Sequence, residues 1–275
     1  METLRDLLAA RFGGSVAAPL PQDEQFLTDI HRVQLAHRSV RRFRPDPLPE
    51  TLLTLILAAA QSAPTSSNLN AYSILVVREA AKKKELARLT GGQAHVEACP
   101  VFLLFCPDIH RLEKICGMAG APPPTNNVEL LLLATVDAAL AGMNAMTAAE
   151  AAGLGAVMIG GVRDAPAEIS ALLELPSGVF PLFGMCLGFP EDAGTVRARP
   201  APAGMIHHEK YQPEKIMPAL REYEALMQPF FDGRGLRRPD GTAATCLTHT
   251  AARLRPAAMR GHIRGFLLQH GFDLT

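Results

Sequence analysis

One long apolar stretch, from about Val128 to Ala152, limits the folds open to this 275-residue chain more than any other feature. Its length would suit a helix that crosses a lipid bilayer. Four polar or charged residues interrupt it, however, and a lipid-facing helix rarely carries such side chains. These residues are Glu129, Asp137, Asn144 and Glu150. The stretch therefore predicts a long helix buried in the core of a folded domain.

Composition excludes two classes of protein. Hydrophobic residues make up 48% of the chain and charged residues 20%, which excludes intrinsic disorder. The 27 basic and 27 acidic side chains cancel, which argues against a protein that binds nucleic acid through bulk charge. Aromatic residues are few, at 5% with no tryptophan, so the core is expected to be aliphatic. The length allows one large domain or two small ones.

Cysteine usage and the first residues indicate a reducing cytoplasm. The five cysteines are an odd number and form no CxxC pair, which argues against a disulfide framework or a zinc knuckle. Cys106 and Cys186 lie in apolar runs, as small buried side chains do. The first residues, METLRDLLAARF, contain no long apolar segment, so we expect no secretory signal. We therefore expect a cytoplasmic protein with no metal site and no membrane span.

Hydrophobic periodicity and turn residues divide the chain into helices and strands. Strands are expected over residues 72–77, 101–106, 156–159 and 180–188. Helices are expected, besides the long one, over residues 2–12, 23–37, 50–62, 80–89, 166–175, 213–231 and 244–270. Pro49 is expected at the first helical position of the 50–62 helix, where its missing N–H costs nothing. Residues 117–126 are expected to be a loop. The expected elements are a mixture of helices and strands, and too few of them are joined by short, two-residue connections to predict a doubly wound sheet.

Several common catalytic motifs are absent from the sequence. No strand is followed by GxGxxG and no GxxxxGK[ST] occurs, which argues against a Rossmann or a P-loop fold. Neither HExxH nor GxSxG occurs, so there is no zinc-binding helix and no nucleophile elbow. We expect most of the nine histidines to be surface residues or hydrogen-bonded core residues.

Four short segments could carry chemistry, and each has a plain structural alternative. The segment from His37 to Arg44 holds four arginines in eight residues. It is either a solvated basic turn or a phosphate cradle built from guanidinium groups and the Ser39 hydroxyl. The polar segment from Pro64 to Asn70 precedes a strand. It is either an ordinary turn or a hydrogen-bonding surface for a polar heterocycle.

The other two segments contain glycine pairs. Thr90-Gly91-Gly92-Gln93 ends a helix, so its glycines are either a simple C-cap or the support of a functional amide at Gln93. Gly160 and Gly161 follow an apolar strand. They form either a tight turn or a place where backbone N–H groups approach a ligand closely.

Taken in order, these segments resemble the nitroreductase superfamily, and more narrowly its oxygen-insensitive NADPH nitroreductase and NADPH–flavin oxidoreductase subgroup. The matching text is HRSVR (37–41), PTSSNLNAYSIL (64–75), LTGGQAHVE (89–97), AGMNAMTAAEAAGLGAVMIGGVR (141–163), PLFGMCLGFP (181–190), Arg197-x-Arg199-Pro200 and HHEKYQ (207–212). The resemblance covers roughly residues 35–238. The chain departs from the pattern at Arg197, where relatives commonly carry lysine, at residues 68–70, and at RRPDGTAATCLTHT.

The resemblance implies an α+β fold of the nitroreductase type. Its elements would be a central mixed or antiparallel sheet flanked by helices, a long core helix, and an intertwined homodimer with two FMN sites at the interface. It also implies one FMN-binding domain over residues 31–275, with a C-terminal helical extension from about residue 200. Residues 1–30 would be an N-terminal extension.

The resemblance also assigns residues to the cofactors. The positions that match the flavin site are His37, Arg38, Ser39, Arg41, Ser66, Ser67, Leu69, Gln93, Met158, Ile159, Gly160, Gly161, Arg197 and Arg199. Arg38, Ser39 and Arg199 are expected to bind the 5′-phosphate. Arg41 and Arg197 are expected near the ring, where a cation stabilises the reduced flavin. The candidates for the 2′-phosphate of NADPH are Arg234, Arg237 and Arg238.

The implied activity is hydride transfer from NADPH, with NADH as an alternative donor, through FMN to a small acceptor such as a nitroaromatic, a quinone or a free flavin. Because the cofactor supplies the chemistry, no catalytic acid, base or nucleophile is assigned. One alternative is another flavin reaction on the same fold, such as dehalogenation or flavin fragmentation, with a lid from residues 1–30 or 232–248. A second is a non-enzymatic module whose arginine-rich turn binds an anion or nucleic acid. Zero net charge and few aromatic residues disfavour the second.

Overall fold

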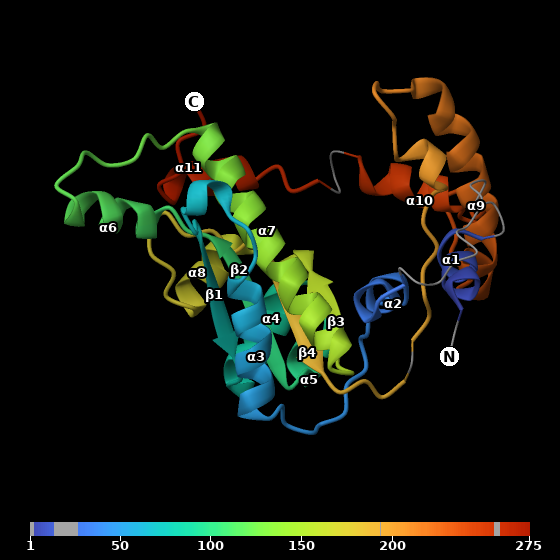
Figure 1. The fold of residues 1–275 in the computed structure, drawn as a ribbon, viewed down its shortest axis with the longest axis horizontal. Helices are drawn as coiled ribbons and strands as arrows, with labels where there is room; N and C mark the ends of the chain where they lie inside the picture. The colour runs from blue at the N-terminus through green and yellow to red at the C-terminus, as the bar shows by residue number, and fades with distance from the viewer. Residues whose placement is uncertain (1–2, 14–26, 193, 256–258) are drawn as a thin grey trace. The chain divides into compact units, whose positions relative to one another are not determined.

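The sheet at the centre of the fold has four antiparallel strands in the order β1-β2-β4-β3 (Figure 1). The computed structural model describes residues 3–13, 27–192, 194–255 and 259–275. The strands are β1 (Tyr72–Val77), β2 (Val101–Pro107), β3 (Gly155–Ile159) and β4 (Phe183–Gly188). The strand order places β1 and β3 at the two edges. Every residue of the central strand β2 is buried, as its continuous apolar run predicts.

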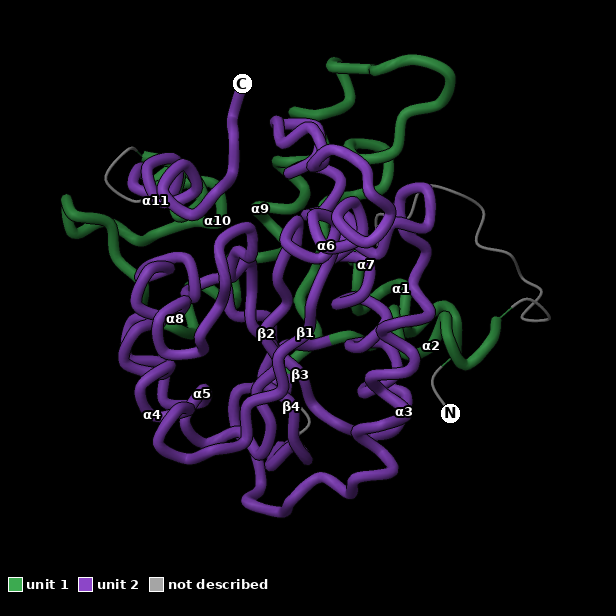
Figure 2. Tube along the Cα trace, turned by 90° about the vertical axis from the view of Figure 1, so that its left-hand side faces the viewer, with its two compact units in different colours: residues 1–37, 195–259 green, residues 38–194, 260–275 purple. Residues whose placement is uncertain are grey.

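Helices cover both faces of the sheet, because successive strand residues point to opposite faces. In β2, Leu103 and Phe105 pack into a cluster with α3 (Glu50–Gln61) and α7 (Val128–Ala151). Phe102 and Leu104 point the other way, into a cluster with α4 (Ala80–Leu89), α5 (Ala94–Ala98) and α8 (Pro166–Leu172). Figure 2 shows the strands between these two helical layers. The predicted α+β fold with a central antiparallel sheet and a long helix is therefore confirmed.

The long apolar stretch forms α7, and small residues make up its buried face. The alanines buried at helical spacing are Ala134, Ala138, Ala141, Ala145 and Ala149. By length and composition α7 could cross a membrane, but this face packs inside the domain beside α3 and the sheet. The opposite face is exposed at Val128, Leu132, Val136, Leu140 and Met143. The predicted core helix is thus buried along one face only.

The chain forms two compact units, drawn in different colours in Figure 2. Unit 2, residues 38–194 and 260–275, contains the sheet and its helical layers. It also contains α6 (His110–Met118), α11 (Ile263–Gln269) and the 3-10 helices η2 (Ser66–Asn68) and η3 (Gly160–Arg163). Unit 1, residues 1–37 and 195–259, contains α1 (Leu4–Phe12), α2 (Asp29–Leu35), η4 (Pro202–Gly204), η5 (Pro213–Lys215), α9 (Ile216–Gly233) and α10 (Cys246–Arg253). Its core forms around Met227 and Phe231 of α9.

The structure corrects three predictions in the second half of the chain. The single helix predicted over residues 244–270 is wrong, because α10 ends at Arg253 and α11 begins at Ile263 in the other unit. The sequence between them contains Pro256, which lacks the N–H that a continuous helix needs. The strand predicted over residues 180–188 begins only at Phe183, and the helix predicted over residues 166–175 ends at Leu172.

Other corrections concern short helices and helix ends. Neither α5 nor α6 is among the predicted helices, and because α6 reaches Met118, the predicted 117–126 loop begins after it. Asp108 was the missed signal for α6, since its Oδ1 accepts the N–H of Arg111 at 2.8 Å. Pro49 is the N-cap of α3, with ψ of 138°, and not its first helical residue. The helix predicted over residues 23–37 is α2, and residues 14–26 lie outside the described part.

Candidate functional site

The arginine-rich segment lies along the outer edge of β3. The N–H of Val40 donates to the carbonyl of Ala156 at 2.9 Å, and Ser39 pairs with Ala156 in a short parallel bridge. Gly155 permits this approach, because a Cβ there would lie 2.7 Å from Cβ of Val40. Val40 is buried, whereas the residues on either side of it, Ser39 and Arg41, are exposed. The edge of β3 therefore holds these two polar side chains at the surface.

The glycine pair after β3 packs against the turn that ends α4. A Cβ on Gly161 would lie 2.6 Å from the carbonyl oxygen of Thr90 and 2.7 Å from Nε2 of Gln93. Nε2 of Gln93 in turn donates to the carbonyl of Thr90 at 2.7 Å. The turn itself requires glycine, because Gly91 and Gly92 have left-handed φ angles of 87° and 73°. The structure therefore brings Gln93 next to the glycine pair.

His95 of α5 lies two residues after Gln93 and close enough to Arg41 to interact with its charge. Burial, and then the positive charge of Arg41, lower the pKa of His95 below its usual value, so the ring is neutral at pH 7. Its Nε2 is buried and has no hydrogen-bond partner among the residues that the structure describes. Such a nitrogen is available to a ligand. Sequence reasoning assigned no role to His95, although it lies two residues after Gln93 within LTGGQAHVE.

Together these residues form one surface at the edge of unit 2, which we call the β3-edge site. It consists of Arg38, Ser39, Arg41, Gln93, His95, Met158, Gly160 and Gly161. Ser39, Arg41 and Met158 are exposed, and Gln93 and Gly160 are partly exposed. The side chain of Ile159 is buried in the core, so only its backbone faces this region. The site thus combines guanidinium, hydroxyl and amide donors with glycine backbone that no side chain covers. This combination suits a planar ligand that carries an anionic group.

A buried carboxylate holds the serine-rich loop, residues 64–70. Asp137 of α7 is 0% exposed and accepts the N–H groups of Ser66, at 2.9 Å, and Ala71, at 3.0 Å. Between these anchors the left-handed residues are Ser67, Asn68 and Asn70, with φ of 48°, 58° and 52°. This conformation is strained for residues other than glycine and persists only where the surroundings impose it. Asp137 therefore fixes the loop that presents Ser66, Ser67 and Leu69.

The serine-rich loop and the β3-edge site lie at opposite edges of the sheet. The loop leads into β1, and β2 and β4 separate β1 from β3. Three strand spacings correspond to about 14 Å. Both lie toward the same end of the sheet, since Tyr72 is opposite Pro107 of β2 and Ile159 is opposite Gly184 of β4. In the described part of one chain, the sheet therefore separates these two groups of predicted residues.

A groove of about 780 Å³ opens beside the serine-rich loop. Leu69 and Asn70 line one part of it, and Arg111 and Lys114 of α6 line another. Arg111 also donates to the hydroxyl of Ser73 at 3.1 Å, which anchors it at the groove. Its lining mixes apolar side chains with amides and two cations, a combination that can hold an aromatic molecule carrying negative charge or electron-poor substituents.

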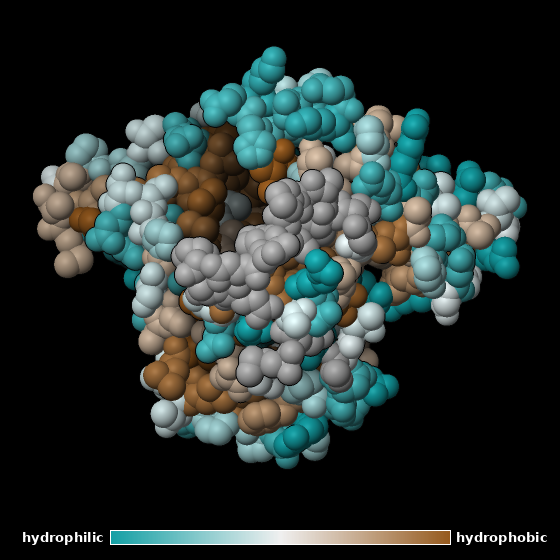
Figure 3. All heavy atoms as spheres, turned by 45° about the vertical axis from the view of Figure 1, so that its right-hand side comes forward, coloured by the Kyte–Doolittle hydropathy of each residue, from teal (hydrophilic) through white to brown (hydrophobic). Residues whose placement is uncertain are grey.

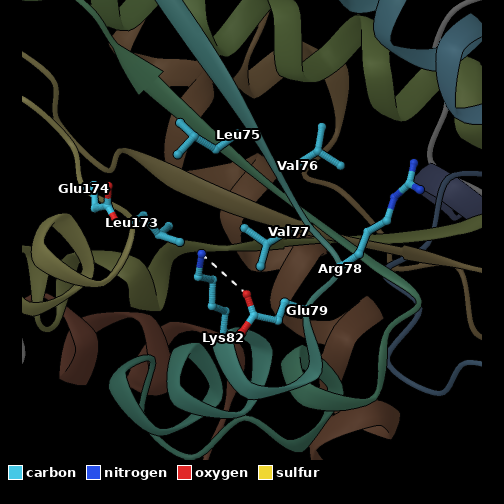
Figure 4. A pocket seen from close by; sticks show the side chains of 8 residues that line it. All are labelled: Leu75, Val76, Val77, Arg78, Glu79, Lys82, Leu173 and Glu174. Atoms are coloured by element: carbon cyan, nitrogen blue, oxygen red, sulfur yellow. Dashed lines mark ion pairs between the residues drawn. The ribbon is translucent and has the colours of Figure 1, made fainter.

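A second pocket, of about 410 Å³, adjoins the last residues of β1 (Figure 4). Figure 4 shows Lys82 and Glu79 facing each other in it, with Nζ 3.5 Å from Oε2. Arg78 and Glu174 also line it. The site residues predicted from sequence, all of which the structure describes, are not among those that line this pocket. We therefore do not include it in the candidate site.

In unit 1, two predicted basic residues meet at Phe230 of α9. The guanidinium carbon of Arg197 lies 3.5 Å from the centroid of the Phe230 ring, and that of Arg234 lies 4.7 Å from it. Both distances allow a cation–π interaction. The predicted flavin residue Arg197 and the predicted NADPH residue Arg234 thus contact the same aromatic ring.

The other two NADPH candidates lie in the turn that follows α9. Arg238 forms an ion pair with Asp240 at 3.2 Å, and Nη1 of Arg237 lies 3.5 Å from the carbonyl of Gly241. Because the Asp240 carboxylate partly neutralises Arg238, this residue has less charge to offer a phosphate than Arg234 has.

His37 and Arg199 line a pocket of about 350 Å³ in unit 1. Arg11, Phe12 and Gln34 line it as well. Arg11 is only 4% exposed, and its guanidinium donates to the backbone carbonyls of Leu35, His37 and Arg197. Sequence reasoning missed Arg11 because it lies before all of the recognised motifs.

Three comparisons with known proteins agree on one family. The model of the Nitroreductase family matches residues 35–189, more than half of the chain. The chain is 40% identical over 201 residues to the oxygen-insensitive NADPH nitroreductase of Salmonella typhimurium, covering 72% of this chain and 81% of the relative. It is 34% identical over 243 residues to the FMN reductase [NAD(P)H] of Bacillus subtilis, and the match covers 86% of this chain and 95% of that relative.

Solved structures give the same result. The Bacillus megaterium protein NfrA2 superposes with a TM-score of 0.84 at 31% identity, covering 90% of this chain and 99% of NfrA2. The NADPH:FMN oxidoreductase of Vibrio harveyi, solved in complex with NAD⁺, superposes with a TM-score of 0.79 at 32% identity, covering 89% and 99%. With matching motifs, fold and relatives, this chain belongs to the nitroreductase family.

Proposed function

We propose that this chain is an FMN-dependent NAD(P)H oxidoreductase that reduces nitroaromatics, quinones or flavins. The observation that carries the proposal is the β3-edge site, where three segments distant in sequence place donors beside a bare glycine backbone. Relatives that cover most of this chain are named FMN reductase, NADPH nitroreductase and NADPH-flavin oxidoreductase, which supports it.

The residues at the β3-edge site fit FMN in their chemistry. Ser39 and Arg38 offer hydroxyl and guanidinium donors to a phosphate, as does Arg199 in unit 1. Nε2 of His95 is buried without a hydrogen-bond partner in the described part of the chain, as expected where a ligand completes the contact. Gly160 leaves its backbone accessible beside the exposed Met158 side chain.

The proposed roles follow from charge and hydrogen bonding. FMN, when bound, supplies the hydride chemistry between NAD(P)H and the acceptor. Arg41 and Arg197 would stabilise negative charge on the reduced ring, and Gln93 would hydrogen-bond its polar edge. We assign no acid, base or nucleophile, and we expect the neutral ring of His95 to serve as a hydrogen-bonding group. Arg234 is the favoured contact for the 2′-phosphate of NADPH, with Arg237 and Arg238 beside it in sequence.

We infer that the protein acts as a homodimer. The exposed stripe of α7, defined by Val128, Leu132, Val136, Leu140 and Met143, is an apolar surface of the kind that a partner covers. Figure 3 shows patches of hydrophobic side chains on one face of the molecule. Because the serine-rich loop lies across the sheet from the β3-edge site, a second copy would have to supply the loop for all predicted flavin residues to meet.

Light scattering after size-exclusion chromatography tests the dimer. We expect about twice the chain mass of 29.5 kDa. Val136→Glu should lower the mass toward that of one chain, whereas Lys84→Glu, at an exposed position on α4, should not. A single-chain mass for the wild-type protein would contradict the dimer.

All five cysteines are free, which suits a reducing compartment, and we propose the cytoplasm. We propose one FMN-binding domain over residues 31–275, with residues 1–30 as an N-terminal extension and a C-terminal helical extension from about residue 200.

An absorbance spectrum tests the proposed function. The purified protein, incubated with FMN and desalted, should show flavin bands that bleach with NADPH without oxygen and return on adding a nitroaromatic or a quinone. Arg41→Ala should weaken FMN binding about tenfold, the loss of one charged contact. Arg42→Ala is the matched control, because Arg42 pairs with Glu191 and Asp192. Failure of the wild-type protein to bind FMN would refute the proposal, and bound flavin that NADPH does not bleach would favour another flavin reaction.

A further inference from the structure

Arg11, in the last turn of α1, is a buried arginine whose side chain donates to three carbonyls in two stretches of backbone. Its Nε and Nη2 donate to the carbonyl of Leu35 at 3.1 and 2.6 Å, and Nη2 also donates to the carbonyl of His37 at 2.7 Å. Its Nη1 donates to the carbonyl of Arg197 at 2.8 Å. In the reverse direction, the N–H of Arg199 donates to the carbonyl of Arg11 at 2.8 Å.

These contacts join two segments that lie far apart in sequence. Residues 35–37 lead directly into Arg38 and Ser39, and residues 197–199 end in Arg199. His37 is a predicted flavin residue, and Arg199 is one of the residues proposed to bind the phosphate of FMN. The Arg11 guanidinium ties one segment at Leu35 and His37, and the other at Arg197.

Only an arginine can make this set of contacts. A guanidinium is planar and carries five N–H donors in a fixed fork, so one buried group can satisfy carbonyls that lie in different directions. A lysine donates from a single nitrogen at the end of a flexible chain, so it cannot reach both segments with the same geometry. The exposed Arg5, on the same helix, offers a natural control.

We infer that Arg11 is a positioning residue, which within unit 1 fixes the spacing between residues 35–37 and residues 197–199 and so holds Arg199, a predicted ligand of the FMN phosphate. The inference rests on the proposed function and gives α1, which precedes all of the matched motifs, a role in cofactor recognition. The 350 Å³ pocket supports it, because Arg11, His37 and Arg199 line the same cavity. The ligand class is a phosphate monoester dianion attached to a flavin.

Riboflavin separates a positioning role from a merely structural one, because it has the same ring as FMN and lacks the phosphate. Dissociation constants for both flavins are measured by fluorescence with the full-length apoprotein of wild type, Arg11→Lys and Arg5→Lys, together with their melting temperatures. We expect Arg11→Lys to weaken FMN binding about tenfold, the loss of one well-placed charged contact, and to leave riboflavin binding within about twofold. Arg5→Lys should change neither constant.

Several results would overturn the inference. Unchanged FMN affinity in Arg11→Lys, or equal losses for FMN and riboflavin, would reduce Arg11 to a packing residue. If Arg11→Lys does not fold, Arg11→Gln is measured in the same way, and failure of both to fold would show that Arg11 serves the fold itself. By contrast, a wild-type protein that binds neither flavin would refute the proposed function.

Discussion

Replacing Asp137 with asparagine should destabilise the protein by removing one of two hydrogen bonds to the serine-rich loop. The carboxylate accepts two backbone N–H groups, those of Ser66 and Ala71, with one oxygen each. Asparagine has the same shape but offers one acceptor oxygen, and its amide nitrogen would face the second N–H. One backbone donor therefore loses its partner, and Ala71 and the Asp137 side chain lie at fully buried positions.

The magnitude follows from the two bonds. A buried N–H without a partner costs about 1–3 kcal/mol, and the remaining bond weakens by about 1 kcal/mol when its acceptor becomes neutral. The neutral amide is cheaper to bury than the carboxylate, which offsets part of this sum. We expect the free energy of unfolding to fall by about 2 kcal/mol.

Urea unfolding followed by circular dichroism measures this loss. Glu129→Gln, an exposed acid in the first turn of the same helix, is the control. It should lower the free energy of unfolding by less than about 1 kcal/mol, the size of a helix-dipole effect. A loss for Asp137→Asn no larger than that of the control would show that the carboxylate does not hold the loop.

Three further results should follow from local packing and burial. Gly161→Ala should lower the free energy of unfolding by about 1–3 kcal/mol, because its Cβ would overlap the Thr90 turn. Gly160→Ala should cost little, because a Cβ there would lie 3.4 Å from the nearest atom, and equal losses for the two variants in urea unfolding would contradict this reasoning. Because burial lowers the pKa of His95 in the folded protein, the unfolded chain binds more protons, so stability should fall as the pH drops below about 6.5. In His95→Gln, the free energy of unfolding should fall less between pH 6.5 and lower pH than it does in the wild type. An unchanged dependence of stability on pH would exclude His95 as the titrating group. Iodoacetamide should label Cys116 before Cys106 in the native protein, because Cys106 is buried and burial raises the pKa of its thiol. Equal labelling of the two cysteines by mass spectrometry would contradict this prediction.

Local patterns in the sequence predicted much of the fold and the family. The bounds of β1 and α4 match the prediction at both ends, because strand alternation and the Gly91-Gly92 stop act over a few neighbouring residues. The ordered motifs also predicted the residues of the β3-edge site other than His95, and among them Gly161 has no room for a Cβ beside the Thr90 turn.

Long-range hydrogen bonds from buried charges were not predictable in this way. In the sequence, nothing local marks Asp137 or Arg11 as a residue with distant partners. In the structure, Asp137 accepts the N–H of Ser66, 71 residues away, and Arg11 donates to the carbonyl of Arg197, 186 residues away. Such a group is stable in the interior only when distant backbone partners satisfy it, and those partners meet only after the helices have packed. Local pattern therefore predicted candidate residues for the site, and tertiary packing decided which buried charges hold their segments in place.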